Sequence, residues 1–373
     1  MLRQELLKKY INKEKIGLEI GPLFWGVCRK DEGFNVLIWD VMQKEELLDK
    51  YKRESKISKK GIEDIDIVSS ESLKIALTGY TKKKGAIIKS VPESLDYIIS
   101  SHNVEHMPNP VQFFLDTSEI LKEGGVVNIA IPISTRCFDC SKPLTSTGQI
   151  LDAYISKNKK PSLGEFFDHE FSIMSVINEK NKRMPINDMT FDFEKLTFDR
   201  ELTYDSYKDL VDAYNNSPYK DSHVWQFNLE SFLLIFEDLL KCRIIENLEI
   251  IDSEIIGNEF IISIRKNKIK KQIISSKERR LNLKKESLIS YVSDLTSKNK
   301  NIFFSEKFFE INNIETFEIS NKTSHIKDLK NKLFEKFYFF SRKILKKTLS
   351  ENKYKSVKSI YQKFKKNYFI NRG

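Results

Sequence analysis

Short apolar runs alternate with helical patterns through the first 132 residues, and this alternation constrains the fold more than any other feature. Five strands are predicted in this part, over 16–20, 36–39, 65–68, 95–100 and 126–131. Strands that alternate with helices are typical of βαβ units, in which parallel strands form one sheet between helices. We therefore predict an α/β fold with a doubly wound, mostly parallel sheet.

Two further strands complete the predicted sheet. The apolar segments 243–251 and 259–265 flank Gly257-Asn258, which is a turn signal between antiparallel strands. Helices are predicted over 232–240 and over 110–122, the second ended by Gly124-Gly125. The sheet is thus predicted to have seven strands and to close with a hairpin.

The segment between the fifth strand and this hairpin has a different character. From residue 134 to about 219 the chain is polar, rich in Phe and Asp, and without a clean period. We interpret 133–225 as a long insertion that forms the substrate site or a lid over the working edge of the sheet. The α/β domain then spans 1–266, and 267–373 form a basic, mainly helical C-terminal extension.

The positive charge of the chain is concentrated at its C-terminal end. Residues 331–373 hold 13 Lys and Arg and two acids, a net charge of +11, whereas the whole chain carries +10, so that 1–330 sum to −1. Apolar residues recur there at three-or-four spacing, which predicts basic amphipathic helices. Such helices bind anionic membrane surfaces. The alternative is a solvated appendage that packs on the body or on a second copy.

Several classes of protein are disfavoured by composition. The apolar runs fall short of the roughly 20 residues needed to span a bilayer, and the polar segment 1–10 is unlike a secretory signal. Four cysteines do not make a disulfide framework, and Cys137-x-x-Cys140 has no partner pair at zinc-ribbon spacing. We expect a cytoplasmic protein, peripheral on the inner face of the membrane if the basic segment binds there, and no metal site is predicted.

The first predicted strand ends in a pattern that suits a ligand. Glu19 and Gly21, followed by Pro22, stand at its carboxyl end, where doubly wound sheets bind ligands and where glycine allows close approach of the backbone. Asp40 ends the second strand about 20 residues later, the place of a carboxylate that accepts ribose hydroxyls. Ser69 and Ser100, near the ends of the next two strands, are further candidate cofactor contacts.

These motifs together resemble class I S-adenosylmethionine (SAM)-dependent methyltransferases of the type 11 group. The resemblance rests on Glu19-Ile20-Gly21-Pro22, on Asp40, on 95–106 with its His102-x-x-Glu105-His106, and on 120–125 before an apolar strand. It covers about 14–132 and resumes in the hairpin at 243–265. It implies SAM as the cofactor, with His102 at the cofactor or at the acceptor.

A narrower resemblance and one departure qualify this picture. The stretch 136–147, with 167–169 and 223–225, is similar to a subgroup that occurs alongside glycosyltransferases of bacterial surface-polysaccharide assembly. Leu23 and Trp25, however, replace the second and third glycines of the usual loop, so contacts over 23–27 cannot be transferred. The missing G-x-G-x-x-G also argues against a nicotinamide dinucleotide enzyme.

The resemblance implies methyl transfer by in-line displacement, for which alignment of donor and acceptor supplies much of the rate. An alcohol acceptor also needs a base, and histidine is suited to that task. His102 and His106 are therefore the catalytic candidates. The alternative is that both rings fix the turn by hydrogen bonds to backbone carbonyls.

Four residues of the insertion are candidates for the acceptor site. Arg136 and Asp139 follow the fifth strand, and a guanidinium there suits an anionic group. His169 beside Asp168, and His223 beside Asp221, could form acid–base pairs, although such pairs also fix loops.

Three functions remain open. The first is O-methylation of a sugar hydroxyl in a surface glycan or in its lipid-linked or nucleotide-linked precursor. The second is methylation of RNA or protein with a polyanion-binding tail, but no nucleic-acid module is recognised and nucleic acid is the less favoured partner. The third is a non-catalytic scaffold, favoured by Leu23 and Trp25 and opposed by Glu19, Asp40 and His102.

Overall fold

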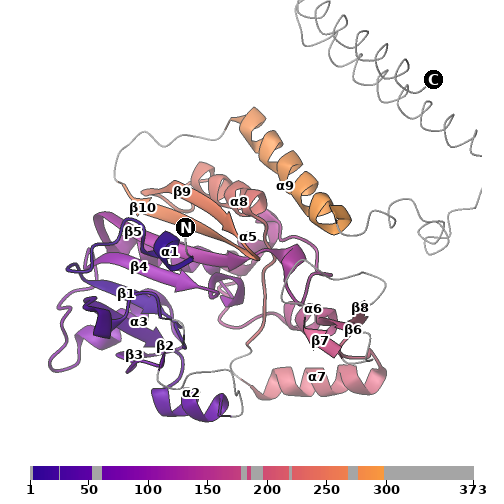
Figure 1. Ribbon diagram of the computed structural model, residues 1–373, viewed down its shortest axis with the longest axis horizontal. Coiled ribbons are helices and arrows are strands. Elements are labelled where there is room, and N and C mark those ends of the chain that lie inside the picture. Colours follow the sequence, from indigo (N-terminus) through magenta and orange to yellow (C-terminus); the bar gives the residue numbers. More distant parts are fainter. Residues whose placement is uncertain are drawn as a thin grey trace, which may run out of the picture. The chain divides into compact units, whose positions relative to one another are not determined.

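A computed structural model describes residues 3–24, 26–52, 61–177, 183–185, 196–217, 221–267 and 276–297. Its centre is a seven-stranded sheet with the order β3-β2-β1-β4-β5-β10-β9 (Figure 1). The first five strands run parallel, and β10 pairs antiparallel with both β5 and β9. The predicted doubly wound, mostly parallel sheet that closes with a hairpin is confirmed.

The parallel strands are buried on both faces, as their continuous apolar sequences require. They are β1 (Gly17–Ile20), β2 (Val36–Asp40), β3 (Ile67–Val68), β4 (Leu95–Ser101) and β5 (Leu121–Pro132). Side chains alternate between the two faces, so that Ile98 of β4 packs in one core and Tyr97 and Ile99 pack in the other. The carboxyl ends of β1 and β2 lie side by side, because Ile20 pairs with Trp39 in the parallel register.

Helices cover both faces of this sheet. One face packs against α3 (Leu73–Thr81), α4 (Pro110–Ile120) and α8 (Leu229–Lys241), and the other packs against α1 (Arg3–Lys8). The short helix α2 (Lys44–Lys50) follows β2. The start of α4 is specified locally, because Asn109 accepts a hydrogen bond from the Gln112 amide and Pro110 occupies the first turn.

Three predicted boundaries need correction. Gly124-Gly125 lie inside β5, which begins at Leu121 directly after α4, because the strand pairs with Leu95 there before a register shift. The strand predicted over 243–251 is β9 (Leu248–Ile256), since Arg243 and Asn247 have φ of 54° and 59° and cannot continue a strand. The predicted turn at Gly257-Asn258 joins it to β10 (Glu259–Lys266).

The insertion is more regular than its composition suggests. It holds α5 (Thr147–Ile155), α6 (Leu163–Ser172) and α7 (Tyr204–Asn216), with a small antiparallel sheet of β6 (Met174–Ile177), β7 (Arg183–Pro185) and β8 (Leu196–Phe198) (Figure 1). The expectation of an irregular segment was wrong, because capping boxes at Ser146 and Ser162 start α5 and α6.

The predicted C-terminal extension begins with α9 (Lys277–Ser297), which packs against α8. Leu283 of this helix is buried, and Arg280 forms an ion pair with Asp238. The predicted amphipathic helices over 331–373, with their predicted membrane contact, lie outside the described residues. Among the residues that are described, no helix combines the length and apolarity needed to cross a membrane.

Candidate functional site

The turn after β1 lies where the strand order reverses, between β1 and β4, which is the ligand-binding position of such sheets. Gly21 has φ of 55°, and its amide donates to the Trp39 carbonyl. A Cβ at Gly21 would lie 2.7 Å from Asn103 Oδ1. Asn103 in turn donates to the carbonyls of Ile20 and Ser101, and so joins the ends of β1 and β4. Glycine is thus required by both conformation and space.

Glu19 holds the segment after this turn through hydrogen bonds to two backbone amides. Its carboxylate is 1% exposed and accepts hydrogen bonds from the Val27 and Cys28 amides, at 2.6 Å and 2.9 Å. Burial raises the pKa of Glu19, although these two amides oppose the change. The observed task of Glu19 is to close the loop after β1, and its predicted contact with a cofactor stays a prediction.

Asp40 stands one strand away at the end of β2. Its carboxylate is largely buried and accepts from the Met42 amide at 3.2 Å. Burial raises the pKa of Asp40. Ser69, just after β3, donates its amide to the Asp40 carbonyl, so the predicted residues of β2 and β3 are adjacent. Pro22 is half-buried beside Gly21.

The end of β4 carries the next predicted residues. The Ser100 hydroxyl is fully buried and has no hydrogen-bond partner among the described residues. His102 has φ of 54°, a conformation that costs a non-glycine residue energy and is typical of functional sites. The strained backbone conformation of His102 sets the direction of its ring, and the surrounding structure holds this conformation in place.

The His102 ring lies between two carboxylates. Its Nε2 is 2.7 Å from Glu259 Oε2, and its Nδ1 is 3.5 Å from Glu105 Oε1. Burial opposes the charged ring, but the contacts with Glu105 and Glu259 outweigh it and raise the pKa of His102 to about 9. A ring that is protonated at neutral pH cannot accept a proton, so this environment favours a hydrogen-bond donor, and the predicted base role stays a prediction.

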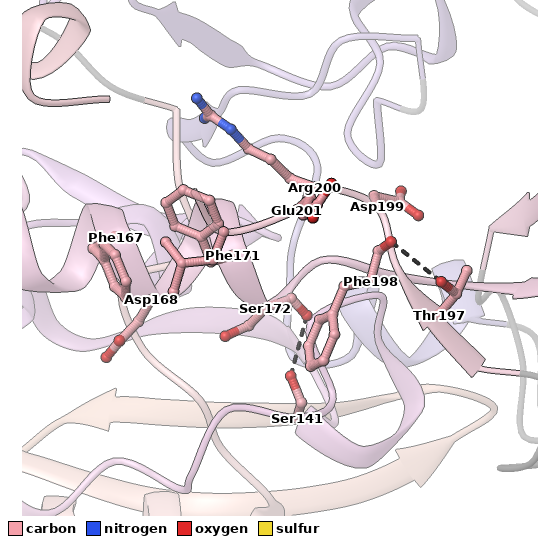
Figure 2. Close-up of a pocket in the computed structure, with 11 residues that line it drawn as sticks. Ser141, Phe167, Asp168, Phe171, Ser172, Thr197, Phe198, Asp199, Arg200 and Glu201 are labelled. Carbon is pink, nitrogen blue, oxygen red and sulfur yellow. Dashed lines mark hydrogen bonds between the residues drawn. The ribbon is translucent and has the colours of Figure 1, made fainter. Parts of the chain in front are cut away.

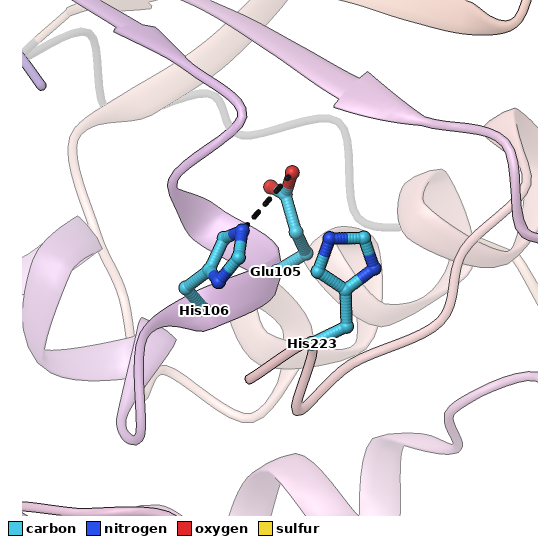
Figure 3. Close-up of side chains that lie close together, drawn as sticks. All are labelled: Glu105, His106 and His223. Carbon is cyan, nitrogen blue, oxygen red and sulfur yellow. Dashed lines mark ion pairs between the residues drawn. The ribbon is translucent and has the colours of Figure 1, made fainter. Parts of the chain in front are cut away.

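Glu105 is the centre of a second group, which Figure 3 shows with His106 and His223. Its carboxylate is fully buried, and neither oxygen has a hydrogen-bond partner among the described residues. His106 Nε2 lies 4.0 Å from Glu105 Oε1, and His106 Nδ1 lies 3.1 Å from Asp221 Oδ1. Burial lowers the pKa of His106 and the carboxylates raise it, with a net increase.

The insertion supplies the other side of this group. The segment that returns from it runs past Glu105, whose carbonyl accepts from the Val224 and Trp225 amides. His223 Nδ1 lies 3.3 Å from Asp139 Oδ1, and Gln226 donates to the other oxygen of Asp139. Asp139 and His223 are buried, so the insertion brings two predicted acceptor residues to the end of β4.

His169 and Arg136 have structural contacts. His169 Nδ1 accepts from the His223 amide at 3.1 Å, and burial lowers the pKa of His169 to about 4. Arg136 donates to the Gly257 carbonyl at 2.6 Å and so fastens the turn of the β9–β10 hairpin. Their predicted contacts with an acceptor stay predictions.

The pairing of histidines with sequence neighbours was wrong. His223 contacts Asp139, and Asp221 instead contacts His106. In α6, consecutive side chains point about 100° apart, so His169 is buried while Asp168 faces a pocket.

That pocket, of about 700 Å³, lies within the insertion (Figure 2). It is lined by aromatic and charged side chains, with small polar ones at its rim: Ser141, Phe167, Asp168, Phe171, Ser172, Thr197, Phe198, Asp199, Arg200, Glu201 and Leu202. None of the predicted cofactor residues lines it. Arg200 is held over the Phe171 ring and pairs with Glu170, which shapes one wall.

Two residues of the site were not predicted from the sequence. Asn103 joins β1 to β4, and Glu105 lies beside the rings of His102 and His106. Asp221 was predicted beside His223 and instead contacts His106. Glu105 stands in the His-x-x-Glu-His motif, and this cluster of ionisable side chains after a buried strand was the available signal.

No family model matches the chain, and no curated protein matches it. Among solved structures, a putative S-adenosylmethionine-dependent methyltransferase from Listeria monocytogenes is 12% identical with a TM-score of 0.31, over 71% of this chain and 97% of that one. An S-adenosylmethionine-dependent methyltransferase from Mesorhizobium loti is 12% identical with a TM-score of 0.32, over 70% of this chain and 96% of that one. A putative zinc-dependent alcohol dehydrogenase from Rhodobacter sphaeroides is 12% identical with a TM-score of 0.36, over 71% and 89%. At such low identities and TM-scores these likenesses carry no argument about activity, and the fold rests on the strand order seen in the chain itself.

Proposed function

We propose that this protein is a SAM-dependent methyltransferase that methylates a sugar hydroxyl of a surface glycan or of its lipid-linked or nucleotide-linked precursor. One observation carries the cofactor assignment. Gly21 and Asp40 end adjacent strands beside the point where the strand order reverses, and the glycine is sterically required there. A tight turn and a carboxylate at the ends of adjacent strands suit a nucleoside with free ribose hydroxyls.

The form of the sheet supports a methyltransferase over a dinucleotide enzyme. The classical dinucleotide fold continues its sheet with parallel strands, whereas here β10 and β9 close it as an antiparallel hairpin. The turn after β1 also lacks the glycine-rich phosphate loop. The cofactor we propose has no pyrophosphate to be held there.

The sugar acceptor is supported by the insertion. Phe167, Phe171 and Phe198 offer apolar faces in its pocket, and Asp168 and Glu201 offer acceptors for hydroxyl groups. A sugar presents C–H faces and hydroxyls that match such a lining. The residues around Glu105 lie between this insertion and the end of β4, where a hydroxyl could meet a methyl donor.

The proposal is tested by transfer of a labelled methyl group from SAM to three acceptor classes: lipid-linked or nucleotide-linked oligosaccharides, RNA, and a protein mixture. We expect label in the sugar fraction with the parent and a large loss with Asp40→Ala. Label only in RNA or only in protein would overturn the acceptor assignment. No transfer to any class, together with no binding of SAM, would favour a scaffold.

A further inference from the structure

The turn that follows β4 contains the buried carboxylate of Glu105. Glu105 is 0% exposed, and both of its side-chain oxygens lack a hydrogen-bond partner among the described residues. Burying an ionised group costs several kcal/mol unless a partner compensates it, and the contacts of the Glu105 carboxylate are long, at 3.5 Å to His102 Nδ1 and 4.0 Å to His106 Nε2. We propose that Glu105, His106 and His223 bind one divalent transition-metal ion of the zinc type.

The spacing of the three side chains suits an ion between them. His106 Nε2 lies 4.0 Å from Glu105 Oε1, which is too long for a hydrogen bond. One ligand atom from each of the three residues lies within 4.8 Å of the others. Two ligand atoms that each lie about 2.1 Å from a tetrahedral zinc ion are about 3.4 Å apart, so the three side chains would have to move closer by roughly 1 Å to close the site.

The orientation of the imidazoles is also that of metal ligands. His106 Nδ1 faces Asp221 at 3.1 Å, and His223 Nδ1 faces Asp139 at 3.3 Å. In the tautomer that donates Nδ1–H to Asp139, His223 presents the Nε2 lone pair on its other side. By contrast, His106 Nδ1 lies beside the Asp221 carboxylate without a hydrogen bond among the described residues. Figure 3 shows both rings with one nitrogen turned toward Glu105. Two lone pairs and a carboxylate then converge, and a cation between them removes their repulsion.

The ligand types select the class of metal. Two imidazole nitrogens and one carboxylate oxygen suit Zn²⁺ and other first-row divalent ions, whereas Mg²⁺ and Ca²⁺ prefer oxygen alone. Three protein ligands leave a coordination position open, which is typical of sites that also bind a substrate oxygen. Only the role of that position in holding an acceptor hydroxyl rests on the proposed function, because metal binding itself does not need SAM.

A second grouping of side chains competes for the same histidine. Cys137 Sγ lies 3.9 Å from His223 Nδ1, next to Asp139. This grouping would use the opposite nitrogen of His223 and would not include Glu105. It also leaves the buried Glu105 carboxylate with only its long contacts to His102 and His106, so we favour the site centred on Glu105.

The test uses the full chain, expressed without a polyhistidine tag, stripped with a chelator and reloaded with Zn²⁺. After gel filtration, metal per chain is measured by elemental analysis, and thermal unfolding is followed with and without the ion. We expect about one zinc per chain, bound in the absence of SAM, and a higher melting temperature. Glu105→Gln and His223→Gln are expected to lose the ion. Asp139→Asn is expected to weaken binding about 10- to 100-fold, as for other partners of metal-bound histidine.

Cys137→Ser is the matched control and is expected to keep the zinc. Loss of zinc in Cys137→Ser but not in Glu105→Gln would overturn the assignment in favour of the other grouping. A parent chain that retains no ion and shows no thermal shift would overturn the site without the use of any variant. SAM titration of the same stripped protein reports separately on the proposed function, so the two failures are distinguishable.

Discussion

The two halves of the candidate site are built in different ways. On the cofactor side, Glu19 and Gly21 lie within three residues of one another, and Asp40 ends the neighbouring strand. On the acceptor side, the Glu105 carbonyl accepts from the Val224 and Trp225 amides. His223 contacts Asp139 from the other end of the insertion. The first half depends on local sequence and sheet register, whereas the second depends on how the insertion folds.

Because the two halves are built separately, a substitution in one half should affect mainly the ligand that this half binds. Lys50 of α2 links the two halves. Its Nζ lies 3.4 Å from Asp221 Oδ2, and its charge partly opposes the increase that burial causes in the pKa of Asp40. Damage to one half should nevertheless leave the other half assembled. The predictions that follow try to break this independence, beginning with the largest expected effect.

Replacing Gly21 with Val should abolish the cofactor half. The side chain would meet Asn103 and would hold φ of 55°, so we expect loss of stability of about 1–3 kcal/mol and at least roughly 100-fold weaker binding of SAM. Gly85→Val is the matched control, because Gly85 has φ of 82° but no atom near its Cβ. It should lose stability through strain and keep SAM affinity, as measured by calorimetry and denaturant unfolding. Equal SAM affinity in Gly21→Val and the parent would contradict the placement of the cofactor.

Asp40→Asn should weaken SAM binding about 10- to 100-fold without unfolding the chain. Hydrogen bonds from hydroxyls to a charged acceptor contribute about 1.5–3 kcal/mol, and the amide retains only part of this. Asp31→Asn serves as the control, because Asp31 is an exposed aspartate in the short turn between β1 and β2. If both variants bind SAM as the parent does, Asp40 does not hold the ribose.

The pH dependence of SAM affinity sharpens the same point. Burial raises the pKa of Asp40, so its carboxylate is protonated at a higher pH than an exposed aspartate would be. Binding needs the ionised form, and affinity should therefore fall as the pH is lowered, beginning at a higher pH than the titration of an exposed aspartate would give. The weaker binding of Asp40→Asn should change less over this range. A parallel decline in both proteins would assign the effect to another group.

Asp221→Asn should have the smallest effect on the cofactor half. Its side chain is 50% exposed, so loss of its pairs with His106 and Lys50 should cost below about 1 kcal/mol of stability. We expect SAM affinity to change by no more than about twofold, while methyl transfer to the acceptor decreases. A large loss of SAM affinity would show that the two halves are coupled and would break the comparison.

The same contrast explains what could be predicted from the sequence. The ends of β1 and β2, with Gly21 and Asp40, were predicted correctly because apolar runs and turn residues are local signals. The helices α5 and α6 were missed although Ser146-x-x-Gln149 and Ser162-x-x-Glu165 mark their starts. Those signals were available and were outweighed by the polar composition.

The partners of the histidines could not be predicted in this way. Asp139 and His223 are separated in the sequence by the small sheet and by the helices α5, α6 and α7, and their contact follows from the path of the insertion. Sequence neighbours such as Asp221 and His223 face different partners because the returning segment binds the Glu105 carbonyl through its backbone. Only a fold places Glu105 among three imidazoles.

Calorimetric titration of SAM into the purified parent chain tests the central claim most directly. The account predicts binding with a micromolar dissociation constant and one site per chain, lost in Gly21→Val and retained in Gly85→Val. Absence of binding to the parent, in both the zinc-loaded and the stripped protein and with candidate acceptors present, would contradict the account.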